Sequence, residues 1–223
     1  MSTYGLILLI SFIIPLIFTF DKNLKFHTQL KFVLKSISIV ALIFIIWDIV
    51  AVKYNVWDFN HTRVLGFKIL GLPIEEILFF FIIPYNLIFI YEVINYYLDD
   101  VELEFSSLFF VPIGLIFFAL TAVVFEKFYT TSVFLAAGIF NFLLFLDSKR
   151  IYASRNFWLS LIITFIPFLI VNFFLTSIPV VFYNDAQNLG LRFVTIPIED
   201  FLYSLVLTGS NYLIYNYFKS NGK

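Results

Sequence analysis

Residues 71–80 read GLPIEEILFF and residues 195–204 read TIPIEDFLYS, so a proline, two adjacent acids and an apolar run occur together twice. The copies are 124 positions apart, which aligns Glu75 with Glu199 and Glu76 with Asp200. Proline suits the first position of a helix, because its missing N–H needs no partner there. Each copy therefore predicts a helix that carries both acids in its first turn and continues as an apolar segment.

The same offset aligns polar and special residues outside this motif without a gap. It places Gly66 on Gly190, Lys68 on Arg192, Asn60 on Asn184, Asp48 on Asn172 and Phe79 on Tyr203. A shared bias towards Phe, Leu and Ile does not align residues of these types. We therefore interpret the two parts of the chain as an internal repeat.

The composition predicts a membrane protein. Of the 223 residues, 61% are hydrophobic and only 13% are charged, whereas a soluble domain carries about 25% charged residues. The net charge of -1 gives no basic field for nucleic acid. The chain has no cysteine, which excludes disulfides, thiolate catalysis and cysteine-bound metals. The two histidines, His27 and His61, fall in predicted loops, and we expect no metal and no cofactor.

Apolar stretches of about 20 residues, the length of a membrane-spanning helix, recur along the chain. They predict an all-α, polytopic membrane protein with about seven transmembrane helices, near residues 4–20, 32–52, 73–97, 107–125, 129–146, 157–178 and 196–218. No Lys or Arg precedes the first stretch, so we expect a retained helix rather than a cleaved signal peptide.

The repeat predicts how these helices are organised. The offset maps the first three helices onto the last three and leaves the fourth as a connector, which gives a 3+1+3 arrangement of parallel halves. We expect a first repeat at residues 1–98, a connector helix at 99–127 and a second repeat at 128–223. In parallel halves both acidic motifs enter the membrane from the same face, so we expect one shared site.

Lys and Arg are distributed unevenly between the two predicted faces of the membrane. Nine lie on the face opposite the N-terminus and five on the N-terminal face. Positive charge tends to stay in the cytoplasm. We therefore expect a multi-pass protein of the cell membrane with its N-terminus outside and its C-terminus cytoplasmic.

The acidic pairs have two interpretations. Acids in the first turn of a helix complement the helix dipole, which is a purely structural role. These helices, however, continue directly into apolar segments, and ionisable residues at membrane depth are costly and usually functional. If Glu75, Glu76, Glu199 and Asp200 share a dry site, mutual repulsion should keep at least one of them protonated. That group would serve as a general acid and an ionised neighbour as a base.

Helical spacing surrounds the acids with aromatic and amide side chains. Phe79 and Asn86 share the stripe of Glu75, and Tyr203 repeats the pattern in the second copy. A Phe stripe is more typical of packing, but aromatic faces beside an acid suit a carbocation, through cation–π attraction worth ~2 kcal/mol. Asp48 and Asn172, the aligned polar residues of the second and sixth predicted helices, would either position the site or form hydrogen bonds between helices. The candidate substrate-binding residues are Asp48, Asn172, Phe79, Tyr203, Asn86 and Asn211.

Several segments resemble the membrane-integral lycopene cyclases, which occur in bacteria and archaea as two small subunits or as one fused chain. They are FIIWD at 44–48, VWDFN at 56–60, GLPIEEILFF at 71–80, LTSIPVV at 175–181 and the second acidic motif at 197–200. The tetrapeptide alone is weak evidence, but two copies at a fixed offset within these contexts are specific. The resemblance spans both halves and nearly the whole chain, as in the fused form.

This resemblance implies cofactor-independent cyclisation of the ends of lycopene to β-ionone rings, giving β-carotene through γ-carotene. A terminal double bond is protonated, the neighbouring double bond attacks the resulting cation, and a ring proton is lost. We expect Glu75 and Glu199 to be the acid/base pair and Glu76 and Asp200 to tune them. The expected partners are lycopene or another carotenoid and membrane lipid, with no nucleic acid; the oligomeric state is left open, a homo-oligomer included.

The residues leave other functions open. A proton-coupled small-molecule transporter also fits parallel three-helix repeats and membrane carboxylates, although small sugar transporters usually carry a Pro-Gln pair that this chain lacks. A non-catalytic membrane partner would not need repeated acidic pairs. The resemblance does not distinguish the β-type reaction on lycopene from a reaction on longer, fifty-carbon carotenoids. It also does not distinguish formation of a β-type ring from formation of an ε-type ring.

Overall fold

The structure is a computed structural model that describes residues 1–222, and it is built mainly from helices. Within these residues there are seven α-helices: α1 (Thr3–Phe18), α2 (Leu30–Lys53), α3 (Ile74–Tyr97), α4 (Phe110–Val123), α5 (Phe128–Leu146), α6 (Arg155–Ser177) and α7 (Glu199–Asn221). The 3₁₀ turns are η1 (Phe26–Gln29), η2 (Ser107–Phe109) and η3 (Ile151–Ala153). The predicted helical fold is confirmed, and the predicted helices begin and end within a few residues of the observed ones.

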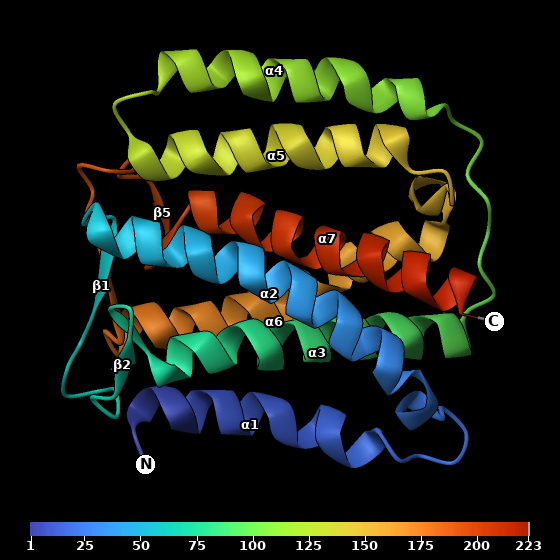
Figure 1. The fold of residues 1–223 in the computed structure, drawn as a ribbon, viewed down its shortest axis with the longest axis horizontal. Coiled ribbons are helices and arrows are strands. Elements are labelled where there is room, and N and C mark those ends of the chain that lie inside the picture. The colour runs from blue at the N-terminus through green and yellow to red at the C-terminus, as the bar shows by residue number, and fades with distance from the viewer. Residues whose placement is uncertain (223) are drawn as a thin grey trace.

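The helices lie side by side and alternate in direction, so that successive helices start at opposite ends of the bundle (Figure 1). The N-terminus lies at one end and the C-terminus at the other. The two helices that carry the acidic motifs, α3 and α7, both start at the N-terminal end (Figure 1). The acidic residues of the two motifs therefore lie at the same end of the bundle.

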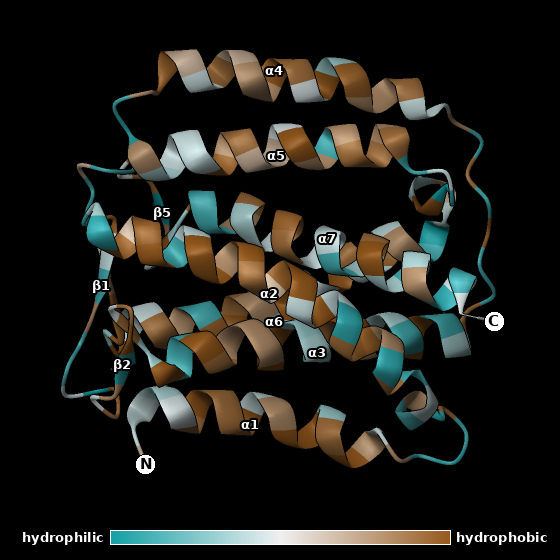
Figure 2. Cartoon of the chain, in the orientation of Figure 1, coloured by the Kyte–Doolittle hydropathy of each residue, from teal (hydrophilic) through white to brown (hydrophobic). Residues whose placement is uncertain are grey.

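Four segments of the described chain are long and apolar enough to cross a membrane: Phe26–Lys53, Ile74–Tyr97, Phe128–Leu146 and Arg155–Ser177. The helices α1 and α4 are apolar but shorter, and α7 carries two acids and several Ser, Thr and Asn residues. Figure 2 shows hydrophobic residues along most of the helices and hydrophilic residues mainly at their ends and in the loops. This distribution is compatible with a membrane protein.

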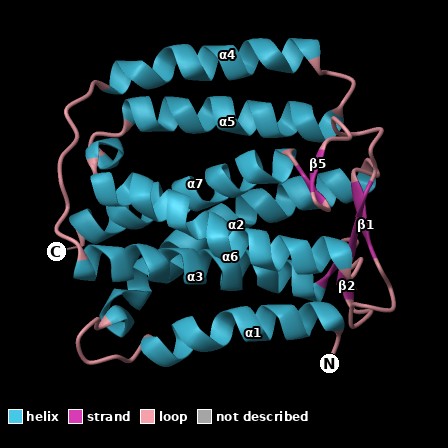
Figure 3. Ribbon diagram, turned by 180° about the vertical axis from the view of Figure 1, so that it is seen from behind, coloured by secondary structure: helices cyan, strands magenta, loops and turns pink. Residues whose placement is uncertain are grey.

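Six short strands gather at the N-terminal end of the bundle (Figure 3). They are β1 (Trp57–Phe59), β2 (Lys68–Ile69), β3 (Leu72–Pro73), β4 (Val181–Tyr183), β5 (Arg192–Phe193) and β6 (Ile196–Pro197). β2 pairs with β3 directly before α3, and β5 pairs with β6 directly before α7. A hairpin of the same kind therefore leads into each acidic helix.

The turns of these hairpins need left-handed backbone. In the first hairpin both turn residues have positive φ, 51° at Leu70 and 93° at Gly71, which matches the twist of a two-residue hairpin. In the second hairpin Val194, 124 positions after Leu70, has φ 58°, although a branched side chain disfavours that conformation. The first turn residue is thus left-handed in both hairpins, whereas the second is left-handed only at Gly71.

Strands β1 and β4 come from different halves of the chain and pair antiparallel with each other. Asp58 pairs with Phe182 at the centre, and Trp57 pairs with Tyr183 beside it. The central partners are 124 residues apart, so exchanging the two strands reproduces the same pairing. Alternation along a strand turns Trp57 and Phe59 inward and leaves Asp58 exposed.

The loops around this strand pair exchange equivalent hydrogen bonds. The backbone N–H of Asn60 donates to Val180 O, and that of Asn184 donates to Val56 O, both at 2.9 Å. The side-chain amides repeat the exchange: Asn60 Nδ2 donates to Pro179 O at 3.1 Å and Asn184 Nδ2 to Asn55 O at 3.0 Å. The loops are therefore joined to each other as well as to their own helices.

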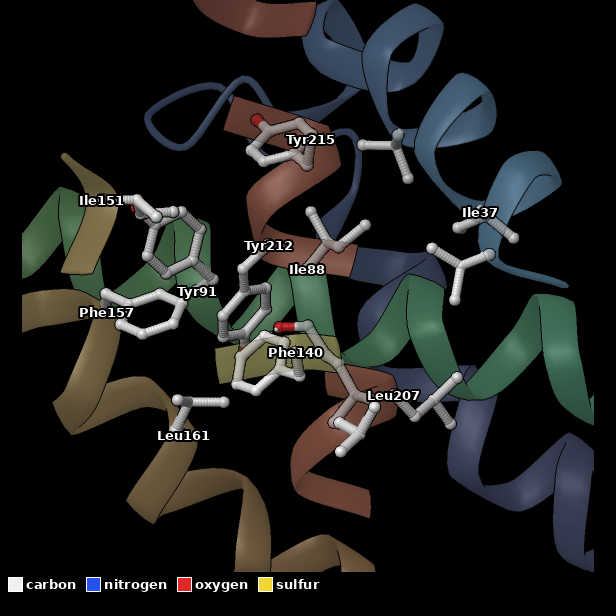
Figure 4. Close-up of a cluster of buried hydrophobic side chains, with 14 of the residues drawn as sticks. Ile37, Ile88, Tyr91, Phe140, Ile151, Phe157, Leu161, Leu207, Tyr212 and Tyr215 are labelled. Atoms are coloured by element: carbon white, nitrogen blue, oxygen red, sulfur yellow. Dashed lines mark hydrogen bonds between the residues drawn. The ribbon is translucent and has the colours of Figure 1, made fainter. Parts of the chain in front are cut away.

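One cluster of buried hydrophobic side chains lies at the acidic end, around Tyr4 and Trp57. Another, drawn in part in Figure 4, joins α2, α3, α5, α6 and α7. Tyr212 of α7 is at its centre, where its ring stacks on Tyr91 of α3 with the centroids 4.7 Å apart. Its hydroxyl donates to Leu87 O at 2.9 Å, which satisfies a buried polar group. This contact fixes α7 against α3 far from the acidic motifs.

Asn60→Ala and Asn184→Ala should each lower the free energy of unfolding by ~1 kcal/mol, because each removes an amide that donates to the opposite loop. Thermal unfolding of the purified protein in detergent, followed by circular dichroism, should show a lower midpoint for both variants. Asn23→Ala removes an exposed amide without a side-chain hydrogen bond among the described residues and is the matched control. Equal midpoints in all three variants would contradict the role of these bonds.

Candidate active site

Four carboxyl side chains at the starts of α3 and α7 are buried. Glu75 is 1% exposed, Glu76 9%, and Glu199 and Asp200 3% each. A buried carboxyl needs hydrogen-bond partners, because an unpaired one is costly. The two members of each pair find different partners, and this difference separates their roles.

Glu75 and Glu199 hold the loops that precede their helices. Oε1 of Glu75 accepts from the backbone N–H of Leu65 at 2.7 Å and from the hydroxyl of Ser2 at 2.6 Å. The matching contacts of Glu199 Oε1 are the N–H of Leu189 at 2.8 Å and the hydroxyl of Thr130 at 2.6 Å. Each glutamate thus ties a residue ten positions earlier to the first turn of its helix and fixes the hairpin between them.

Glu76 and Asp200 are held by tyrosine hydroxyls instead. Tyr4 donates to Oε2 of Glu76 at 2.6 Å. Tyr129 donates to Oδ1 of Asp200 at 2.5 Å, and Tyr183 donates to Oδ2 at 2.9 Å. Both oxygens of Asp200 therefore accept a hydrogen bond, whereas Oε1 of Glu76 has no partner among the described residues.

Tyr183 lies in β4, outside the helices, and acts as a donor to Asp200. Burial, followed by the negative charge of Asp200, raises the pKa of Tyr183 well above its ordinary value. The phenol therefore keeps its proton at neutral pH. It donates its hydrogen bond to Asp200 and so orients that carboxyl group.

A cavity of about 690 Å³ lies between α1, α3, α6 and α7. Its wall includes Glu76 and Asp200, but neither Glu75 nor Glu199. Along α3 the wall runs from Glu76 to Ile90, a length of ~21 Å at ~1.5 Å per residue. Most other wall residues are apolar. The cavity is thus an elongated apolar space with two acids near one end.

The structure brings four of the predicted substrate-binding residues to the cavity wall: Phe79, Tyr203, Asn86 and Asn172. One of them, Asn86, also has a structural contact. Pro15 has no N–H, so the carbonyl of Ser11 lacks its partner within α1. Asn86 Nδ2 donates to that carbonyl at 3.1 Å and thereby joins α1 to α3.

The other two predicted substrate-binding residues lie outside the cavity wall. Asn211 is fully buried, and its amide donates to Leu207 O within α7 at 2.9 Å. Asp48 is also buried, and its Oδ1 accepts from the indole N–H of Trp57 at 2.6 Å. Because Trp57 lines the cavity, Asp48 supports the wall from behind.

The sequence analysis did not identify the three tyrosines that bind the acids. Tyr4 and Tyr129 are 125 residues apart, one more than the offset of the acidic motifs. If the alignment of the repeat allowed a gap of one residue, Tyr4 would align with Tyr129, and the two tyrosines could have been predicted as equivalent residues. Tyr183 could not have been predicted in this way, because the offset aligns it with Phe59.

This arrangement suits proton transfer to and from an apolar molecule. Glu76 and Asp200 face one space, and the rings of Phe79, Tyr203 and Trp57 form part of its wall. Aromatic faces stabilise a cation, and an apolar wall excludes the water that would react with it. The site therefore combines two carboxyl groups, which can give or take up a proton, with surfaces suited to positive charge.

Comparison with known proteins identifies relatives of the chain. The model of a protein family described as lycopene cyclase matches residues 1–94 and 126–218. A bifunctional lycopene cyclase/phytoene synthase of Phaeosphaeria nodorum is 32% identical over 63 residues. That match covers 28% of this chain and 11% of the relative. No solved structure matches the chain.

Glu75→Ala should loosen the loop before α3, because two donors lose their shared acceptor, a loss of ~1–3 kcal/mol for a buried group. Limited trypsin digestion in detergent should then cut faster after Arg63 and Lys68, as measured by mass spectrometry. Glu76→Ala changes the neighbouring acid, which binds a tyrosine of α1, and should leave these cuts at the wild-type rate. If trypsin cuts Glu75→Ala no faster than wild type, the glutamate does not anchor the loop.

Proposed function

The chain belongs to the lycopene cyclase family, and on this basis we propose that it closes the ends of lycopene into β-ionone rings. The products are the monocyclic γ-carotene and then β-carotene. The observation that carries the proposal is that one acid from each motif, Glu76 and Asp200, faces the same apolar cavity. The reaction is a net isomerisation, so it needs a proton donor, a proton acceptor and a dry space.

Glu76 is the proton donor in this proposal. A protonated carboxyl carries its proton on one oxygen, which then acts as a donor. Among the four oxygens of Glu76 and Asp200, Oε1 of Glu76 is the one that accepts no hydrogen bond from the described residues, so it can carry the proton and point it at the substrate. Its proton adds to the terminal double bond of lycopene and leaves a tertiary cation. The neighbouring double bond then attacks the cation, which forms the carbon–carbon bond of the ring and moves the charge into it.

Asp200 is the proton acceptor. Its two oxygens accept hydrogen bonds from the phenols of Tyr129 and Tyr183, and the ionised carboxylate is the form that these two donors fit. A carboxylate keeps further lone pairs after accepting two hydrogen bonds. When Asp200 removes a ring proton, the electron pair of the broken C–H bond forms the double bond of the β ring and neutralises the cation. The proton on Asp200 then returns to Glu76 before the next cyclisation.

These roles reverse the expectation within each acidic pair. The sequence analysis expected Glu75 and Glu199 to react, with Glu76 and Asp200 tuning them. The hydrogen bonds of Glu75 and Glu199 to their loops and their absence from the cavity wall support an anchoring role instead. The second acid of each motif is therefore the proposed reactive one.

Aromatic rings stabilise the cationic intermediates. Phe79 and Tyr203 occupy aligned positions on α3 and α7, one turn after the acids, and both line the cavity. A cation against such a ring gains ~2 kcal/mol when water is excluded. Both rings thus share the cavity with Glu76 and Asp200, where the charge is proposed to develop.

The halves are proposed to be parallel three-helix repeats joined by α4. Three matched features support this: the symmetric pairing of β1 with β4, the paired hairpins before α3 and α7, and the matching contacts of the two anchoring glutamates. In the cell membrane this arrangement would comprise seven spans. The excess of Lys and Arg at the other end of the bundle supports an external N-terminus and a cytoplasmic C-terminus.

A single site then processes both ends of the substrate. Val171 and Ser204 line the cavity, and the repeat offset aligns them with Trp47 and Phe80. The ring of Trp47 packs on Tyr203 at 4.9 Å, and Phe80 is buried in the core. Large side chains thus fill the space that would correspond to a second cavity, so lycopene must leave after one cyclisation and return with its other end.

Glu76→Gln and Asp200→Asn should each slow ring formation by ~10²–10⁴-fold, the usual contribution of a general acid or base. Each variant would be expressed in a lycopene-accumulating bacterium, and the pigments separated by chromatography at matched protein levels. Glu75→Gln and Glu199→Gln keep an acceptor oxygen for the loop and should retain most of the activity. Unchanged lycopene with well-expressed wild type would rule out the cyclase, and full activity of Glu76→Gln would rule out its proposed role.

Tyr203→Leu should slow each cyclisation by roughly 30-fold, because it removes an aromatic face worth ~2 kcal/mol to the cation. If the two ends react one after the other, the slowed variant should accumulate γ-carotene before β-carotene appears. Tyr203→Phe keeps the ring and is the matched control, with a product pattern close to wild type. A slowed variant that yields only lycopene and β-carotene at all times would exclude release between the two steps.

A further inference from the structure

The wall of the cavity is buried on one side and exposed on the other. Wall residues of α3 and α7 are buried or half-buried, with Leu87 at 5% and Leu207 at 3% exposed among the buried ones. Wall residues of α1 and α6 include Ile10 at 61% and Ile170 at 54% exposed. A side chain that lines a cavity and also lies on the outer surface marks the edge of an opening. The opening therefore lies between α1 and α6.

The edges of this opening are apolar stripes. On α1 the exposed wall residues are Leu6, Ile10 and Ile14, which follow one another at intervals of four. On α6 they are Ile170 and Phe174, at the same interval. Residues four apart lie on one face of a helix, so each stripe runs along the opening. We call these five residues the rim.

Side-chain hydrogen bonds attach α1 to α3, whereas its packing against α6 involves no hydrogen bond among the described residues. Tyr4 binds Glu76 near the start of α1, and Asn86 binds the carbonyl of Ser11 near its middle. Thr19, at the end of α1, pairs with the hydroxyl of Tyr85. No hydrogen bond joins α1 to α6 among residues 1–222. The two sides of the opening therefore belong to helices that approach each other without a hydrogen bond between them in the described residues.

The end of the cavity next to the acids is covered. Trp57 and Phe59 of β1 and Val181 and Tyr183 of β4 all line the cavity, and β1 pairs with β4 across it. Access from water at this end would require that strand pair to separate. The route that the structure leaves open is lateral, across apolar side chains.

We propose that the acyclic polyene enters the cavity sideways from the bilayer, through the opening between the rims of α1 and α6. One end reaches Glu76 and Asp200, and the adjoining polyene lies along α3 over the ~21 Å of the wall. This inference deepens the proposed function and rests on it, because it names the route by which that substrate reaches the acids. An apolar rim admits a hydrocarbon already dissolved in the membrane at little desolvation cost.

The absence of cysteine from the chain permits a clean test. Ile10→Cys and Ile170→Cys each place one thiol on the rim, and Ile116→Cys places one on the exposed face of α4 as the matched control. Each purified variant in lipid vesicles would be modified with pyrene maleimide, which is bulky, or with methyl methanethiosulfonate, which is small. Mass spectrometry would verify complete modification.

Two readouts separate the route from the chemistry. The first is conversion of lycopene to cyclic products, and the second is binding of lycopene, measured by quenching of tryptophan fluorescence, since Trp57 lines the cavity. The bulky adduct at either rim position should abolish both conversion and quenching, and the small adduct there should lower them much less. Either adduct at the α4 position should leave both close to unmodified protein.

The outcomes distinguish failure of the route from failure of the function. Wild-type binding and conversion after complete pyrene modification of both rim variants would overturn lateral entry while the cyclase remains. Binding that the rim adducts block, without any cyclic product from wild type, would support the route and overturn the proposed reaction. Loss of binding with the adduct on α4 as well would show a general effect of the label and would also overturn the assignment of the rim.

Discussion

Burial of four carboxyl groups at one end of a helical bundle is the constraint on which the rest of the structure depends. Each group needs donors, since an unpaired acid in an apolar setting is costly, and the donors come from elements that precede the acidic helices. Tyr4 and Ser2 at the start of the chain serve the first pair, and Tyr129 and Thr130 at the start of α5 serve the second. Satisfying the acids therefore docks the first helix of each half on its third and fixes the loop between them.

The helices α3 and α7 both pack against each other and line the cavity. Around Tyr212, α7 is fixed to α3 by a stacked ring and a hydrogen bond, whereas nearer the acids the same helices border a cavity. An empty cavity reduces stability, because its lining loses packing contacts. The packed end and the paired strands β1 and β4 hold the helices on both sides of this space. A preformed apolar cavity with fixed acids is the kind of site that a reactive hydrocarbon cation requires.

Much of this organisation follows from the sequence, because long apolar segments and a repeated motif are strong signals. The helices, the common end for both acidic motifs and the equivalence of Glu75 with Glu199 could be predicted. Which acid of each pair faces the cavity could not, because adjacent positions differ by about 100° around a helix, and the direction that becomes the cavity is set by the packing of α1 and α6. Asn211 illustrates the same limit, since it shares the stripe of Asp200 but lies too far along α7, among buried residues. The symmetric pairing of Asp58 with Phe182 was implicit in the offset of 124 residues, but no local pattern indicated that those loops form strands.

The most direct test of the central claim is an experimental structure of the chain bound to a lycopene analogue whose terminal double bond is saturated, so that it cannot be protonated. The terminal carbons should lie between Glu76 and Asp200, about 3–3.5 Å from the oxygen that would deliver the proton, with the polyene along α3. An analogue whose end lies against Glu75 or Glu199, or outside the cavity, would contradict it.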